Sequence, residues 1–137
     1  MFRRATPQDV RHVYSLLRRF YAKQGHIYSE IPFDFDSAAR TIETVILRGV
    51  CLVGTKSCAG ALLLPFQWNN TAIVANVLFW YFESPGQIRI LEALMAACKE
   101  AGATHFVAVS HFPENRIGRR YEKLLLTACE ESFIGKL

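Results

Sequence analysis

The chain has 137 residues, of which 51% are hydrophobic and 20% are charged, and its formal net charge is +4. This composition excludes an intrinsically disordered protein and predicts a single globular domain over residues 1–137. Three Arg-Arg pairs, at positions 3–4, 18–19 and 119–120, are spread along the chain, whereas nucleic-acid binders gather basic residues on one face. No apolar run is long enough to span a membrane and no secretory signal follows the first residues, so we expect a cytoplasmic protein that binds neither membranes nor nucleic acid.

The first half of the chain predicts a short strand, two helices and a hairpin. After a strand over residues 2–5, Thr6-Pro7-Gln8-Asp9 has the residues of a helix start: an N-cap Thr, an early Pro and an acid. The apolar residues that follow at helical spacing, and that we expect in the core, are Val10, Val13, Tyr14, Leu17 and Tyr21.

A loop over residues 26–35 leads to a second helix, which we expect Asp36 or Ser37 to cap and Gly49 to end. Strands at residues 50–53 and 59–66 flank a turn at residues 54–57, and this arrangement predicts a hairpin.

Residues 71–102 form the most informative segment: a long apolar strand, a tight turn and an amphipathic helix. Over residues 73–82 both alternate sets are mostly apolar, which predicts a central strand covered on both faces. The turn at residues 83–86 then starts a helix over residues 86–101, whose first N–H groups have no intrahelical partner and suit an anion. Because open α/β sheets commonly bind ligands at such a junction, we expect the functional site here.

The remaining residues predict a strand at 105–110, a helix at 116–126 and a last strand at 131–137. The expected order is β-α-α-β-β-β-α-β-α-β, a mixed α/β (α+β) fold with a central mixed sheet flanked by helices. The four cysteines form no CxxC pair, and neither acids nor cysteines accompany His105 and His111 in a ligand pattern. We therefore expect reduced core cysteines and no metal site.

Four segments carry a resemblance to a known family. They are residues 2–9 with their short strand and helix start, residues 78–81 of the long strand, residues 90–103 with their Gly-Ala ending, and residues 115–124, which contain Asn115 and Tyr121. Their order and spacing resemble the GNAT superfamily of acyl-CoA-dependent N-acyltransferases, in particular its small bacteriophage-type members. The resemblance extends over most of the chain and implies a GNAT-like fold.

The resemblance also implies a binding site for acetyl-CoA, the co-substrate of that family. The cofactor-binding residues that it implies are Val77, Leu78, Phe79, Ser84, Gly86, Gln87 and Asn115. The strand residues would hold the pantetheine arm through their backbone, and the turn residues would meet the pyrophosphate. Asn115 would bond to pantetheine or, alternatively, cap the last helix. The turn is several residues shorter than the family's usual R/Q-x-x-G-x-G/A loop, lacks its basic residue and one glycine, and contains Pro85, which has no N–H.

Two residues suit direct acyl transfer from a thioester to an amine. Tyr121 matches the family's acid, which protonates the leaving thiolate, and it also lies on an apolar helix face that suits a core tyrosine. Glu83 ends the central strand and would act as the base, directly or through water, or would simply be a solvated loop residue. The acceptor is a small-molecule or protein amine of unknown identity, and candidates for its pocket are Tyr28, Phe33, Phe35 and Trp68.

Two functions of different classes stay open. The preferred one is an N-acetyltransferase that moves an acetyl group from acetyl-CoA to a primary amine. The alternative is a catalytically degenerate GNAT-fold binding or assembly module, for example a virion-associated phage component, and the short turn favours it. The apolar C-terminal strand would allow a homodimer or a larger protein assembly.

Overall fold

The computed structural model describes residues 1–23, 31–109, 121–124, 126 and 127. Its strands form one mixed sheet in the order β1-β2-β3-β4-β5, in which β1 to β4 are antiparallel neighbours and β5 is parallel to β4. The strands are β1 (Arg3–Arg4), β2 (Val50–Gly54), β3 (Ser57–Phe66), β4 (Asn69–Phe82) and β5 (His105–Val107). The expected mixed α/β fold is confirmed.

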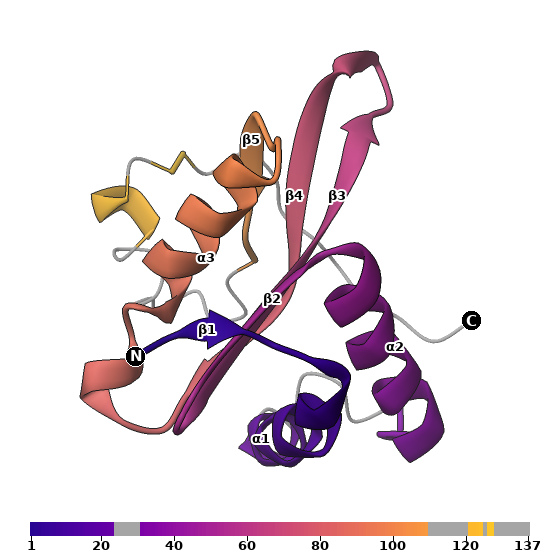
Figure 1. Cartoon of the computed structure of the whole chain (residues 1–137), viewed down its shortest axis with the longest axis vertical. Coiled ribbons are helices and arrows are strands. Elements are labelled where there is room, and N and C mark those ends of the chain that lie inside the picture. Colours follow the sequence, from indigo (N-terminus) through magenta and orange to yellow (C-terminus); the bar gives the residue numbers. More distant parts are fainter. Residues whose placement is uncertain (24–30, 110–120, 125, 128–137) are drawn as a thin grey trace.

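Helices cover both faces of this sheet, with α1 and α2 on one face and α3 on the other (Figure 1). Their bounds are α1 (Val10–Lys23), α2 (Phe35–Arg48) and α3 (Ile90–Glu100), and the short 3-10 turns are η1 (Pro7–Asp9) and η2 (Pro85–Gln87). Residues 121–123 are also helical, within the span expected for the last helix. The rest of that helix and the expected last strand lie outside the described residues. Within the described residues, no helix is both long and apolar enough to cross a membrane.

The sheet separates two hydrophobic cores, because successive side chains of a strand point to opposite faces. The core under α1 and α2 contains Val13, Leu16, Ile42, Val45, Cys51, Val53, Cys58, Phe79 and Tyr81. The core under α3 contains Val50, Leu52, Ala59, Ala61, Ala75, Ile90, Leu94 and Cys98. Strands β2, β3 and β4 contribute to both cores, so the middle of the sheet is covered on both faces.

The core-facing side of helix α1 includes more residues than the expected stripe. Leu16, which the stripe did not include, is fully buried together with Val13, and Phe20 packs against the same core. Val10, Tyr14 and Leu17 are only partly buried at its margins. The expected stripe is thus confirmed at Val13 and incomplete, because packing against the sheet and α2 also turns Leu16 and Phe20 inward.

Two helix starts also differ from the sequence prediction. Helix α2 begins at Phe35, since Asp34 is its N-cap and its carboxylate accepts the Ser37 N–H at 2.9 Å. Helix α3 begins at Ile90 instead of residue 86, because the preceding residues wind into η2, where the Ser84 carbonyl accepts the Gln87 N–H at 2.8 Å. The expected end of α2 at Gly49 is confirmed.

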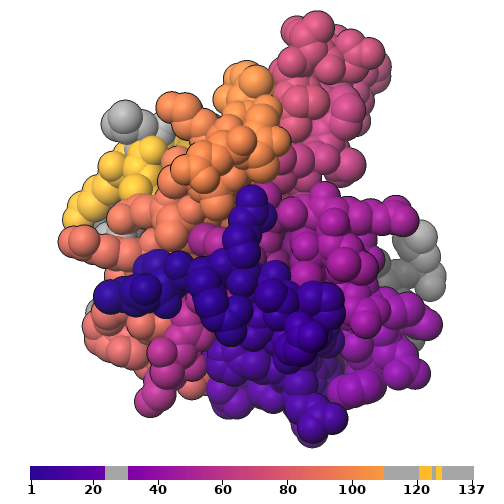
Figure 2. All heavy atoms as spheres, viewed as in Figure 1, coloured from indigo at the N-terminus to yellow at the C-terminus, as the bar shows by residue number. Residues whose placement is uncertain are grey.

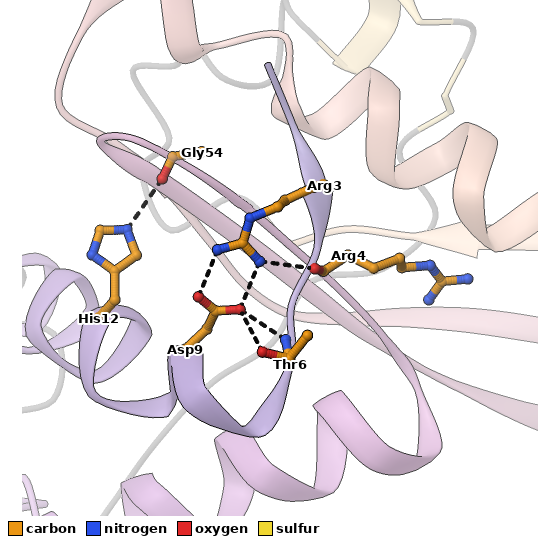
Figure 3. A network of polar contacts seen from close by, with 6 residues as sticks. All are labelled: Arg3, Arg4, Thr6, Asp9, His12 and Gly54. Atoms are coloured by element: carbon orange, nitrogen blue, oxygen red, sulfur yellow. Dashed lines mark hydrogen bonds and ion pairs between the residues drawn. The ribbon is translucent and has the colours of Figure 1, made fainter.

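A network of polar contacts anchors β1 to the start of α1 (Figure 3). Arg3 donates two hydrogen bonds of 2.8 Å to the Asp9 carboxylate, and the Thr6 N–H donates a third of 2.8 Å. Nearby, Nε2 of His12 lies 3.1 Å from the carbonyl oxygen of Gly54 and links α1 to β2. The pKa of Asp9 lies well below its ordinary value, mainly because of the hydrogen bond from Arg3.

This network predicts a pH-dependent contribution to stability. We expect Asp9→Asn to lower the free energy of unfolding at pH 7 by about 1–2 kcal/mol, since charge-assisted hydrogen bonds are lost at a partly solvated site. Because the pKa of Asp9 is lower in the folded than in the unfolded state, this contribution is complete above the unfolded value near 3.9 and is lost as the pH falls through the folded value. Urea denaturation at pH 7 and at pH 3 measures the difference. The control Asp36→Asn changes an exposed acid in the first turn of α2, and an equal loss in both variants would contradict the assignment.

Candidate functional site

Strand β4 separates from β5 at the segment expected to hold the cofactor. Within the described residues, β5 pairs with β4 only at residues 74–76. Just beyond, the pairing of β4 with β3 shifts between Gly60 and Ala61, so that Leu78 is the extra residue of a β-bulge. A bulge bends its strand and increases the local twist. Past residue 76, the edge of β4 that faces β5 therefore has no strand partner in the described part of the chain.

The bulge changes two expectations for β4. The strand is central, as expected, but the Leu78 side chain is 48% exposed, so the prediction of cover on both faces was wrong at this residue. Gly60 lies on β3 opposite Phe79, next to the bulge. A Cβ at Gly60 would lie only 2.4 Å from Cζ of Phe79, so a larger residue would clash with the ring. The phenyl ring thus lies directly over the glycine backbone. A glycine inside an apolar strand is a known signal for a bulge or a close approach, and it was the available clue.

Tyr121 lies next to this unpaired stretch of β4. Its hydroxyl accepts a hydrogen bond of 2.8 Å from Nε1 of Trp80 on β4 and donates one of 2.9 Å to the carbonyl of Val109, which follows β5. The side chain is 8% exposed. Burial raises the pKa of Tyr121, and the hydrogen bond from Trp80 partly offsets that rise. Tyr121 therefore connects β4 to the chain after β5, at the level where the two strands no longer pair.

Glu83 lies at the end of β4 and contacts α1. Nε of Arg19 donates a hydrogen bond to the Glu83 carboxylate. This hydrogen bond is the main reason why the pKa of Glu83 is lowered. Beside it, Nζ of Lys23 donates a hydrogen bond of 2.9 Å to the Tyr81 hydroxyl. Glu83 is thus an ionised carboxylate among cationic groups at neutral pH. Within the described part of the chain, no contact joins Glu83 to Tyr121, and the sequence contained no local signal for the pairing of Glu83 with Arg19.

The turn after β4 holds the three residues expected to meet pyrophosphate. The carbonyl of Ser84 accepts the N–H of Gln87, and the Gln87 side chain accepts a hydrogen bond of 2.8 Å from the Ser57 hydroxyl on β3. Gly86 differs from both, since no heavy atom lies within 4 Å of the position that a Cβ would occupy. Asn115, the remaining expected cofactor residue, lies outside the described residues.

A groove of about 460 Å³ lies beside the bulge, between α2 and the sheet. Its lining residues are Ser37, Arg40, Thr41, Thr44, Leu62 and Leu78. The aromatic residues expected to line an acceptor pocket are placed elsewhere. Phe33 and Phe35 pack against Tyr14, with ring centroids 5.7 and 4.6 Å apart, whereas Trp68 is 81% exposed in the turn between β3 and β4. Tyr28 lies outside the described residues.

The described cysteines and histidines form no further site. Cys51, Cys58 and Cys98 are buried free thiols, and burial raises the pKa of Cys51 to about 12 and that of Cys98 to about 11. These thiols are therefore unreactive at neutral pH. Among the residues that the structure describes, no three His, Cys, Asp or Glu side chains are grouped to hold a metal ion.

Comparisons with known proteins show similarity in structure. No family model matches the sequence, and no curated protein matches it. A protein from Bacillus halodurans, crystallised as a mutant, has a TM-score of 0.78 at 14% identity, with 100% of this chain and 99% of that one covered. A predicted acetyltransferase from Clostridium acetobutylicum, crystallised with acetyl-CoA, has a TM-score of 0.71 at 17% identity, with 99% and 95% covered. An aminoglycoside acetyltransferase from an uncultured soil metagenomic sample has a TM-score of 0.64 at 15% identity, with 100% and 96% covered. At such low sequence identities, the structural similarity shows that this chain shares the fold of these proteins.

Proposed function

We propose that this chain, which has the fold of GNAT-type acetyltransferases, transfers an acetyl group from acetyl-CoA to a primary amine. One observation carries the proposal: in the described part of the chain, the pairing of β4 with β5 ends next to the bulge at Leu78, and the Tyr121 hydroxyl lies close to that point. An unpaired strand edge offers hydrogen-bonding groups to an extended ligand, and the tyrosine offers a proton.

Acetyl-CoA would bind along this edge. The backbone of Val77, Leu78 and Phe79 would bond to the amide groups of the pantetheine arm, and the open space around Gly86 would admit the pyrophosphate. The turn has fewer donors than a long glycine-rich loop, because the N–H of Gln87 is already bonded to the Ser84 carbonyl. When bound, acetyl-CoA supplies the activated acetyl group. Asn115 would add a side-chain contact to the pantetheine arm.

Tyr121 and Glu83 would divide the proton transfers. As the amine nitrogen bonds to the acetyl carbon and the carbon–sulfur bond breaks, Tyr121 gives its hydroxyl proton to the departing sulfur. Glu83 would receive the proton of the amine through water. The lowered pKa of Glu83 makes it a weak base. We therefore expect the ammonium form of the acceptor to lose its extra proton to bulk solvent before the amine reacts.

The groove beside Leu78 would receive the acceptor amine. Leu62 and Leu78 contribute apolar surface to it, and Arg40 is the only charged residue among the described residues that line it. A small-molecule amine or a lysine side chain of a protein would fit this open groove equally well. The groove and the unpaired edge of β4 meet at the bulge, so an acceptor there would approach the thioester from the α2 side.

We expect acetyl-CoA to stabilise the protein against thermal unfolding. A ligand that binds the folded state at 100 times its Kd adds about 2.7 kcal/mol to the free energy of unfolding. Differential scanning fluorimetry with millimolar acetyl-CoA, followed by an assay of thiol release with a panel of amines, tests binding and transfer in turn. Adenosine 3′,5′-bisphosphate is the control ligand, because it lacks the pantetheine arm and cannot use the edge of β4. No stabilisation by acetyl-CoA would overturn the proposed function.

A second candidate function is a non-catalytic assembly module. The hairpin formed by β3 and β4 projects from the body of the protein (Figure 2), and on it the side chains of Leu64, Phe66 and Trp68 are 52%, 44% and 81% exposed. Exposed apolar groups of this kind are typical of protein contacts. Light scattering that shows an oligomer sensitive to Trp68→Ser, together with an absence of acetyl-CoA binding, would favour the module.

A further inference from the structure

The Tyr121 hydroxyl has two partners, and each restricts it differently. It accepts the Trp80 indole N–H at 2.8 Å and donates its own proton to the Val109 carbonyl at 2.9 Å. The two rings lie 6.2 Å apart at an interplanar angle of 47°. A phenol carries one proton and two lone pairs, so these contacts determine the orientation of the hydroxyl and leave one lone pair unused.

We infer that Trp80 is a positioning residue for Tyr121: its indole N–H orients the hydroxyl and stabilises the phenolate that remains after proton transfer. This inference rests on the proposed function, in which Tyr121 is the acid. For the transfer, the O–H turns about the Cζ–O bond from the Val109 carbonyl toward the sulfur, while the Trp80 hydrogen bond keeps the oxygen in place. The Val109 carbonyl then has no donor and cannot bond to the phenolate oxygen. The Trp80 N–H is a donor only, so its hydrogen bond strengthens as negative charge develops on that oxygen.

The surroundings of the two rings support this role. Tyr121 is 8% exposed, and an isolated phenolate is costly to form where little water reaches it. Burial and the Trp80 hydrogen bond are the influences on the pKa of Tyr121 within the described part of the chain, and they act in opposite directions. The Trp80 ring is itself held by Phe82, which stacks on it with centroids 5.6 Å apart. The proton balance closes when the phenolate takes a proton from water after the thiol has left.

The variant Trp80→Phe tests the inference, because it keeps an aromatic ring and removes the N–H. We expect the pKa of Tyr121 to rise by about one unit, read from tyrosine Cζ resonances by NMR with the Tyr121 signal identified in Tyr121→Phe. With acetyl-CoA and an active amine, we expect kcat to fall about tenfold, KM to stay nearly constant and the alkaline limb of the pH profile to move upward. The matched control Phe82→Leu loosens the ring stack but keeps the N–H, and it should shift the Tyr121 titration much less than Trp80→Phe does.

The outcomes separate the inference from the proposed function. An unchanged Tyr121 titration in Trp80→Phe, in a protein that still turns over acetyl-CoA, overturns the role of Trp80 alone. Wild-type protein that neither binds nor uses acetyl-CoA overturns the proposed function and the inference that rests on it. Should Trp80→Phe fail to fold, the wild type provides the test: the indole ¹⁵N–H resonance of Trp80 should titrate with the midpoint of Tyr121. An independent midpoint also overturns the inference.

Discussion

Replacing Tyr121 with phenylalanine should lower kcat about 100-fold, the lower range of what a general acid contributes. The thiolate would then leave without a proton from the protein. The affinity for acetyl-CoA should change by less than about twofold, because the contacts proposed for the pantetheine arm come from the β4 backbone and not from this side chain. Steady-state kinetics and isothermal titration with acetyl-CoA measure the two quantities separately.

The same substitution has a structural cost that must be separated from the kinetic one. Phenylalanine leaves the Trp80 N–H and the Val109 carbonyl without the hydroxyl that joins them, which should cost about 1–2 kcal/mol of stability. Kinetics are therefore measured well below the Tm of the variant. Tyr14→Phe is the matched control, because Tyr14 packs on α1 against Phe35, away from the unpaired edge of β4. Equal kcat in Tyr121→Phe and wild type would remove Tyr121 from the mechanism.

The second large effect is expected at Gly49, which ends α2. A Cβ at this position would lie 2.2 Å from the carbonyl oxygen of Ala61 and 3.1 Å from that of Val45. Both oxygens belong to backbone, and Ala61 is held in the sheet by its pairing with Val50, so neither can yield without breaking secondary structure. We expect Gly49→Ala to lower the free energy of unfolding by about 3 kcal/mol, the upper range for overpacking.

Guanidinium denaturation measures this loss, and Gly86→Ala is its control. No heavy atom lies within 4 Å of the Cβ position at Gly86, so alanine there meets no clash and also restricts the unfolded chain. Its stability should equal or slightly exceed that of the wild type, by up to about 1 kcal/mol. Wild-type stability in Gly49→Ala would mean that α2 and β3 are not packed as closely as described.

The order of the described elements followed from the sequence because its signals are local. Thr6 and Asp9 meet three residues apart at the first helix start, and Gly49 ends α2 where the sequence placed the stop. The GNAT-like fold was recognised from these local patterns and their spacing along the chain, and the solved structures share it.

The sequence was less able to predict which of several similar residues takes a given position, because that choice depends on how the element packs against its neighbours. Asp34, Asp36 and Ser37 are all good N-caps by residue type, and the choice of Asp34 depends on which residues of α2 can face the sheet. The full burial of Leu16, next to the partly buried Leu17, has the same origin, since packing against the sheet and α2 decides which of two adjacent leucines points straight into the core.

The sequence by itself thus determined the mixed α/β architecture, because hydrophobic period and turn residues act over a few positions, and it predicted a candidate site along β4 and the turn that follows it. Tertiary structure alone decided how the site is built. The Trp80–Tyr121 hydrogen bond joins residues 41 positions apart, and the Glu83–Arg19 pair joins residues 64 apart. Contacts at such separations form only when whole elements pack against one another, so no local pattern could specify them.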